Sequence, residues 1–486
     1  MDTETKQLMA VVAIAALCPF AVVAALVSQR LRDVALFAFT FGAVLMVRMD
    51  VVLFGTFWYR GTSRGVQLSI LDVLPLCLFL ATLLFPRYPR GRFYWPAGLG
   101  LTLLYLGYCC VSVLISDPQI YGVWELAKMF RGLLVFLAAA LFIRTNRELA
   151  IVVAALAATA CLQGFNGIEQ RLFKGAIRPP GTLDHANTLS TYLCLIAPVL
   201  VAAAMANWWK WLRGFAAFGW LMAAGAELMT LSRMGIPVFI MVSGGTAIVC
   251  SSWRPSKEKF GVIALVAVAA AIFLPVTWPA LKERYMQGDI RAELTDEKQI
   301  ETRGVYWRTA KMMIEDHPYG VGLNNWSYSV STVYGPLMGY KYVDYGDIIE
   351  PTKEEAHHIT LPPAADSLPS LTLGELGIPG AVIFLLLWLR WLQIGAVFLG
   401  QRLNDEPMHR VAIGIAFGIF GMFLQSATEW TYKQPGVFFT ASIMIGALAA
   451  MHRARKLAKK EAKRRRLEGE SDLRSANAEL RMQNAE

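Results

Sequence analysis

Polar side chains stand in four groups between the apolar stretches of this 486-residue sequence, and their types suit the binding of an anion. The groups contain Arg178, His185 and Asn187; Arg233; Arg303, Trp307 and Arg308; and His357, His358, Asp366 and Glu375. Arginine keeps its charge at neutral pH, and its planar fork can hold two phosphate oxygens at once. Arginines from separate segments could therefore bind a pyrophosphate and stabilise the charge that develops as it departs.

A transfer to a hydroxyl also needs a group that accepts the hydroxyl proton, and histidine or a carboxylate can do this. The fourth group offers His357, His358, Asp366 and Glu375 for the role. The sequence has no Asp-x-Asp pair and no His, Asp and Glu residues at the close spacing of a metal site. We therefore expect no metal and no cofactor.

The elements that position these groups are apolar helices. The chain is 56% hydrophobic and 17% charged, and apolar runs of about 18–22 residues predict membrane-spanning helices. The runs lie at about 8–28, 34–56, 66–85, 96–115, 126–143, 148–165, 187–206, 214–231, 234–250, 260–278, 371–399, 410–428 and 435–451. The alternation of a β-barrel is absent. We expect an all-α polytopic membrane protein with about twelve or thirteen spans.

Basic residues in short loops predict the orientation of these helices. The stretch HRARKLAKKEAKRRR follows Met451 and should lie in the cytoplasm, with the tail 452–486. Counting back through the spans places the segments 116–125, 166–187 and 279–370, together with Ser232-Arg233, on the opposite face. All four polar groups therefore share one side of the membrane.

Four regions follow from this layout: transmembrane helices over 1–278, a long loop with short helices over 279–370, further transmembrane helices over 371–451, and the basic tail over 452–486. Arg48 and Asp50 interrupt the second run, which predicts a broken or re-entrant segment and leaves the side of the N-terminus open. Much of the net charge of +10 lies in the tail, which indicates a membrane surface rather than nucleic acid. The tail could be a simple anchor or bind anionic lipid headgroups.

Each polar group also has a plainer interpretation. Arginines at loop ends often extend to the lipid headgroups as anchors, and a histidine pair in a polar loop is often just solvated. Glu375, followed by Gly377 and Gly380, could simply begin a helix. The seven cysteines lie within or at the end of apolar runs, which is typical of packing residues.

Several short motifs between about 165 and 380 occur in a set order. They are Arg178, Gly181-Thr182, His185-Ala186-Asn187, Ser232-Arg233, Arg303 with Trp307, Pro318-Tyr319-Gly320-Val321-Gly322, and Glu375-Leu376-Gly377-Ile378-Pro379-Gly380. In these motifs the chain resembles the O-antigen ligase and O-antigen polymerase superfamily of bacterial inner-membrane glycosyltransferases. The resemblance implies a GT-C-like bundle of about a dozen membrane helices, capped by a long periplasmic loop.

The chain departs from the family pattern at one functional position. Nine residues before Glu375 the family usually has a histidine followed by asparagine, and that histidine is regarded as the base; here Asp366 and Ser367 stand there. The resemblance thus implies that Asp366 acts as the base, unless His357 or His358 reaches the site. The tripeptide at His185 also has alanine where the family has proline.

The resemblance implies that a glycan moves from undecaprenyl diphosphate to a sugar hydroxyl on the periplasmic face of the bacterial inner membrane, with the C-terminus cytoplasmic. Arg178, Arg233, Arg303 and Arg308 would hold the diphosphate. The partners implied are the lipid-linked glycan donor, a glycan acceptor, membrane lipids, a flippase and a chain-length regulator, with no nucleic acid. The missing histidine favours a polysaccharide polymerase over an O-antigen ligase; a transporter of lipid-linked oligosaccharide and a protein-glycosylating enzyme are the other hypotheses.

Overall fold

The computed structural model describes residues 3–483 apart from 57–58, 85–92, 252–263, 265–266, 269–270, 274, 276, 284–302, 340–362 and 401–405. The first half of the chain forms α1 (Thr3–Val27), α2 (Gln29–Gly42), α3 (Met46–Met49), β1 (Val51–Leu53), β2 (Val66–Leu68), η1 (Ile70–Asp72), α4 (Val73–Leu84), α5 (Leu99–Ile115), α6 (Ile120–Phe142), α7 (Asn146–Leu172), α8 (Ala186–Met205), α9 (Lys210–Thr230) and α10 (Gly235–Cys250). The second half forms α13 (Arg303–Asp316), α14 (Trp326–Ser329), the π-helical turn η2 (Val330–Tyr334), α15 (Gly335–Leu337), α17 (Leu368–Ala396), α18 (Pro407–Gln425), η4 (Thr431–Lys433) and α19 (Pro435–Gln483).

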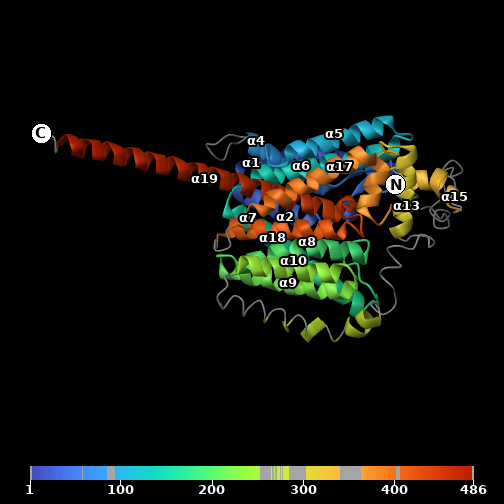
Figure 1. Cartoon of the computed structure of the whole chain (residues 1–486). Helices are drawn as coiled ribbons and strands as arrows, with labels where there is room; N and C mark the ends of the chain where they lie inside the picture. Colours follow the sequence, from blue (N-terminus) through green and yellow to red (C-terminus); the bar gives the residue numbers. More distant parts are fainter. Residues whose placement is uncertain are drawn as a thin grey trace.

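The long helices lie side by side in one bundle (Figure 1). The short helices α13 and α15 gather at one end of the bundle, here called the site end. At the other end, the tail end, α19 leaves the bundle and continues as a single helix to Gln483. The expected all-α polytopic membrane fold is confirmed.

Five helices of the described residues are long and apolar enough to cross a membrane: α7, α8, α17, α18 and the first part of α19. Shorter apolar helices occur at Val11–Val27, Ile70–Leu84, Leu99–Ile115 and Gly235–Cys250. The expected run at 260–278 lies largely outside the described residues. The number of spans therefore stays a prediction.

The expected interruption of the second run takes the form of a β-hairpin inserted after α3. β1 and β2 pair antiparallel, with Val51 opposite Leu68, so their backbone groups satisfy one another. Asp50 and Asp72 flank the hairpin, and Arg131 of α6 binds both carboxylates at 2.9 Å. This pairing places the hairpin against α6.

A break in α17 fixes the loop elements to the bundle. Gly377 has φ 63° and ψ −169°, so the helical backbone is interrupted there. The run 318–322 docks on the break: Val321 N–H donates to the Gly374 carbonyl at 3.0 Å, and Gly322 N–H to the Glu375 carbonyl at 2.9 Å. In return, Ile378 N–H donates to the Pro318 carbonyl at 3.1 Å. Two motifs far apart in the sequence thus form one backbone junction.

The junction predicts that Gly377→Ala destabilises the protein. A Cβ at Gly377 would lie 2.2 Å from the Pro318 carbonyl oxygen, and the positive φ is unfavourable for alanine. We expect a loss of more than about 1 kcal/mol of stability, measured as a lower midpoint of thermal unfolding in detergent. Gly107→Ala in α5 is the matched control, because nothing lies within 4 Å of its added Cβ. An equal effect of the two substitutions would contradict the role of the junction.

Candidate functional site

Arg178 is the centre of a polar network at the site end. Its Nε donates to the Thr230 carbonyl at the end of α9 at 2.9 Å. Its Nη2 donates to the side-chain oxygen of Asn187 at the start of α8. The Asn187 amide then donates to Oε1 of Glu429 at 2.6 Å. Glu429 is nearly buried, with 9% of its surface exposed, and it lies between α18 and η4. The network therefore joins segments from four parts of the chain.

The sequence around His185 explains how Asn187 reaches this position. His185 is the N-cap of α8, with extended backbone, and its Nδ1 accepts the Asn187 N–H at 3.4 Å. Partial burial and the neighbouring Arg178 lower the pKa of His185, which favours the neutral ring that this acceptor role needs. His185 therefore acts here as a helix cap that orients Asn187.

The turn between Arg178 and His185 is held by two glutamines of α7. The Gln163 side-chain oxygen accepts the Thr182 N–H at 2.9 Å, and the Gln170 amide donates to the Gly181 carbonyl at 2.7 Å. Gly181 has φ 65°, which only glycine adopts readily. These bonds fix the loop that carries Arg178.

Arg233 lies on the tight connection between α9 and α10. The connection begins at Leu231 with φ 51°, and the Ser232 hydroxyl accepts the Gly235 N–H at 3.1 Å. Arg178 donates to the carbonyl of Thr230, three residues before Arg233, so the segments that carry the two arginines lie next to each other in space. The structure thus brings together the first two polar groups expected from the sequence.

Asp366 is exposed on a short segment immediately before α17. The segment is anchored on both sides of Asp366. Ala364 N–H donates to the Arg60 carbonyl at 3.1 Å, and Leu368 N–H approaches the carbonyls of Ser426 and Glu429 at 3.0 and 3.3 Å. Asp366 therefore lies beside the segment that holds Glu429, and so beside the Arg178 network.

The residues predicted from the sequence do not include Arg60, Arg64 and Glu429. Arg60 and Arg64 are exposed on the segment after β1, and they could add charge for an anion. Partial desolvation and the neighbouring Arg60 lower the pKa of Arg64 from its ordinary value, and Asp184 offsets part of this effect. Two signals could have indicated these residues: an Arg-x-x-x-Arg pair after the broken second run, and the lone acid in the short link between the last two apolar runs.

The third expected group lies on α13. Arg303 and Trp307, four residues apart, both belong to α13. Tyr306 and Met313 pack in a cluster with Leu371 of α17, whereas Trp307 is 48% exposed and Arg308 is exposed. These two side chains thus point away from the packed face.

Glu375 occupies a buried ion network below the site rather than its surface. Lys433 lies 3.4 Å from Oε2 of Glu375 and 3.4 Å from Oε1 of Glu125, and Lys128 lies 2.7 Å from Glu125. Burial disfavours the charge on Lys433, but the two glutamates outweigh it and raise the pKa of Lys433. Glu375 is 1% exposed, and in this structure its carboxylate takes part in an ion pair. Its catalytic role stays a prediction.

The other expected bases, His357 and His358, lie outside the described residues. Within the described ranges, no three His, Cys, Asp or Glu side chains gather as a metal site. The absence of a metal therefore stays a prediction.

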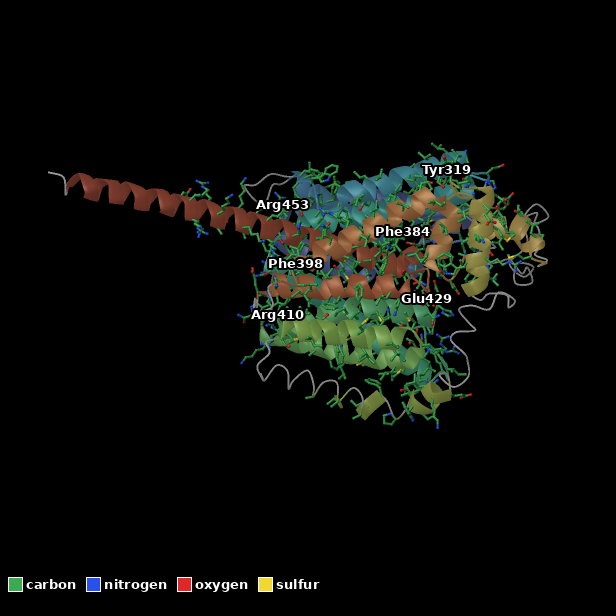
Figure 2. All side chains as sticks on the ribbon, in the orientation of Figure 1. Tyr319, Phe384, Phe398, Arg410, Glu429 and Arg453 are labelled. Carbon is green, nitrogen blue, oxygen red and sulfur yellow. The ribbon has the colours of Figure 1, made fainter. Side chains whose placement is uncertain are left out.

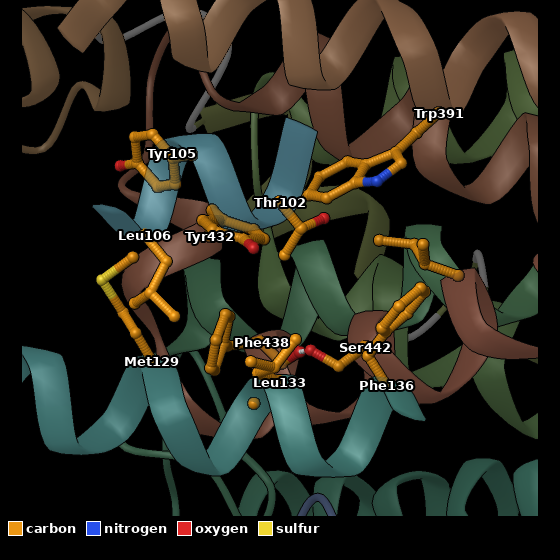
Figure 3. Close-up of a pocket in the computed structure, with 12 residues that line it drawn as sticks. Thr102, Tyr105, Leu106, Met129, Leu133, Phe136, Trp391, Tyr432, Phe438 and Ser442 are labelled. Atoms are coloured by element: carbon orange, nitrogen blue, oxygen red, sulfur yellow. Dashed lines mark hydrogen bonds between the residues drawn. The ribbon is translucent and has the colours of Figure 1, made fainter. Parts of the chain in front are cut away.

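An apolar pocket lies deeper in the bundle, between α5, α6, α17 and α19 (Figure 3). Aromatic side chains dominate its walls, including Tyr105, Trp391, Tyr432 and Phe438. Tyr432 is the neighbour of Lys433 in the sequence, so the pocket begins next to the buried ion network. The pocket has a volume of about 30 Å³, which leaves room only for a water-sized group, so it is a small gap in the aromatic packing.

These features define a polytopic membrane protein with an arginine-containing site at one end of its bundle. Residues 217–385 match the family model described as O-antigen ligase. This match supports the O-antigen ligase and polymerase superfamily for the chain, and with it an activity of the glycosyltransferase type in general. The match includes Arg233, Arg303 and Asp366, whereas Arg178 and Glu429 lie outside it. No curated protein sequence matches the chain.

The ion network predicts that Lys433→Met destabilises the protein strongly. The substitution leaves the Glu375 carboxylate buried without its cation, and the loss should reach about 3–5 kcal/mol. Thermal unfolding in detergent measures it. Lys311→Met is the control, because its partner Glu315 lies 3.8 Å away and the two side chains are 74% and 63% exposed. The control should change stability by less than about 1 kcal/mol; a comparable loss from both would contradict the network's role.

Proposed function

We propose that the protein transfers a glycan from undecaprenyl diphosphate to a sugar hydroxyl, as a polymerase of exopolysaccharide, capsule or O-antigen chains. The observation that carries the proposal is the network from Arg178 through Asn187 to Glu429, beside the segment of Asp366. It supplies a fixed cation next to a carboxylate, at the end of a membrane bundle.

The orientation of the bundle supports the same proposal. The tail end carries the basic residues of α19 from Arg453 onward, which favours a cytoplasmic position for that end. Figure 2 places Arg453 near the tail end and Glu429 near the site end. The site end then faces the periplasm of a bacterial inner membrane, where no nucleotide sugar is needed as a donor.

The proposed step is a single displacement at the anomeric carbon of the donor sugar. The acceptor hydroxyl oxygen forms the new bond to this carbon, and the bond from the carbon to the diphosphate oxygen breaks. The lipid diphosphate leaves with the electron pair, and Arg178 and Arg233 stabilise its charge. Asp366 takes the proton of the hydroxyl. Glu429 positions Asn187, and through it the guanidinium of Arg178.

An O-antigen ligase is the second candidate, and the description of the matching family favours it. The two candidates share the donor and differ in the acceptor, which is a growing glycan for a polymerase and a lipid A core for a ligase. Asp366, in the place of the ligase-like histidine, is the reason to place the polymerase first.

The test compares Arg178→Lys and Asp366→Asn with the unaltered chain, using purified protein and lipid-linked donor. Asp366→Asn should lower turnover by about 10²–10⁴ with little change in donor binding, because a base acts on the acceptor. Arg178→Lys should weaken the binding of the donor, because lysine cannot form the fork contact. The control is Lys174→Gln, on the same loop, where Lys174 and its partner Glu169 are 61% and 50% exposed.

Product analysis decides between the candidates. A ladder of glycan lengths supports a polymerase, and glycan on a lipid A core supports a ligase. Full activity of both variants would overturn the proposed site. Movement of the donor across liposomes without any new glycosidic bond would overturn the enzyme proposal in favour of transport.

A further inference from the structure

A polar pocket lies at the tail end of the bundle, whereas the network of Arg178 lies at the site end. It is formed by the segment before α5, the start of α5, the later part of α17, and α19 where it leaves the bundle. Its cationic and ring side chains are Arg390, His452, Arg453, Lys456, Tyr94 and Trp95. Among the residues that the structure describes, no aspartate or glutamate lines it. The pocket encloses about 480 Å³, which is enough for a phosphate group with its substituents.

One wall of the pocket is rigid. The Tyr94 hydroxyl donates to the Ala140 carbonyl of α6 at 2.5 Å. The guanidinium of Arg453 lies 3.7 Å from the centre of the Tyr94 ring, in a cation–π contact. Two helices and the segment before α5 are thereby joined around Arg453. A cation held in this way needs little reorganisation to bind an anion.

The rest of the lining carries the more accessible charges. Arg390 projects from α17, and its Nη1 donates to the Gln393 side chain at 2.6 Å. Lys456 is exposed, one turn along α19 from the nearly buried His452. Arginine and lysine on facing helices can contact separate oxygens of one phosphate.

The surroundings of the pocket indicate a lipid rather than a free ion. Trp95 is 63% exposed at its mouth, and exposed tryptophan is typical of the headgroup level of a membrane. On the adjoining surfaces of α5 and α17, Leu104 and Leu389 are 52% and 48% exposed. An anionic headgroup in the pocket would thus place its acyl chains against exposed leucines.

We propose that this pocket, built by Arg390, Arg453 and Lys456, binds the phosphate headgroup of an anionic phospholipid in the leaflet at the tail end. The site is separate from the network of Arg178 and does not rest on the proposed transfer reaction. Bound lipid joins α5, α17 and α19 at the point where the last helix leaves the bundle.

The test is native mass spectrometry of the delipidated full chain with phosphatidylglycerol and, in a parallel arm, phosphatidylcholine. The unaltered chain should retain phosphatidylglycerol in preference to phosphatidylcholine. The double variant R390Q/K456Q should bind it about tenfold more weakly or worse, since each basic residue contributes appreciably to anionic lipid binding at a membrane surface. The single variant Lys456→Gln, at an exposed position, should show an intermediate loss and covers the case in which the double variant does not fold.

The matched control is K460Q/K463Q, which removes the same charge from exposed positions further along α19. It should bind phosphatidylglycerol as the unaltered chain does. A third arm adds inorganic phosphate: displacement of the lipid by low phosphate concentrations would assign the pocket to a soluble anion and overturn the proposal. Equal weakening in the control, or equal retention of phosphatidylcholine, would also overturn it.

Discussion

The buried ammonium of Lys433 is the interaction on which the site end depends. It stands between the carboxylates of Glu125 in α6 and Glu375 in α17, each 3.4 Å away. A charge in such a place is tolerated only because its partners repay the loss of water, and removing one partner leaves the other unsatisfied. Lys433 therefore ties the short link between α18 and α19 to two helices of the bundle.

This tie determines where the polar groups of the surface can lie. Glu429 is on the same link as Lys433, and it holds Asn187, which holds Arg178. The link also receives the N–H of Leu368, two residues after Asp366. The backbone junction at Gly377 then fixes the loop of Pro318 to α17. A buried ion network and a break in one helix thus position an arginine and a carboxylate that come from distant parts of the sequence.

The sequence predicts the parts of this arrangement that depend on local chemistry. Apolar runs predict the long helices, because the interior of a bilayer satisfies no backbone groups. The apolar run expected at 187–206, for example, matches α8 to within a residue at each end. Basic loops place the polar groups on one side, and the structure gathers Arg178, Arg233 and Asp366 at one end.

The remaining features depend on contacts that no local pattern records. In the sequence, Glu429 is an ordinary acidic residue of a loop. Its functional position depends on its contact with Asn187, 242 positions earlier. Glu375 reads as a catalytic candidate because its motif fits, but its surroundings are set by Lys433 from a later segment. Arg131 binds the two aspartates that flank the β1–β2 hairpin, whereas in the sequence it is only a charge within the apolar run 126–143. The pattern of apolar residues therefore predicts the helices but not which charged residues from distant segments pair with one another.

A cryo-electron microscopy structure of the full chain with a lipid-diphosphate-linked glycan bound would test the proposed site most directly. The diphosphate should contact the guanidinium groups of Arg178 and Arg233 at the site end, with the first sugar toward Asp366. A diphosphate bound at the tail end, or at the site end without contact to either arginine, would contradict this prediction.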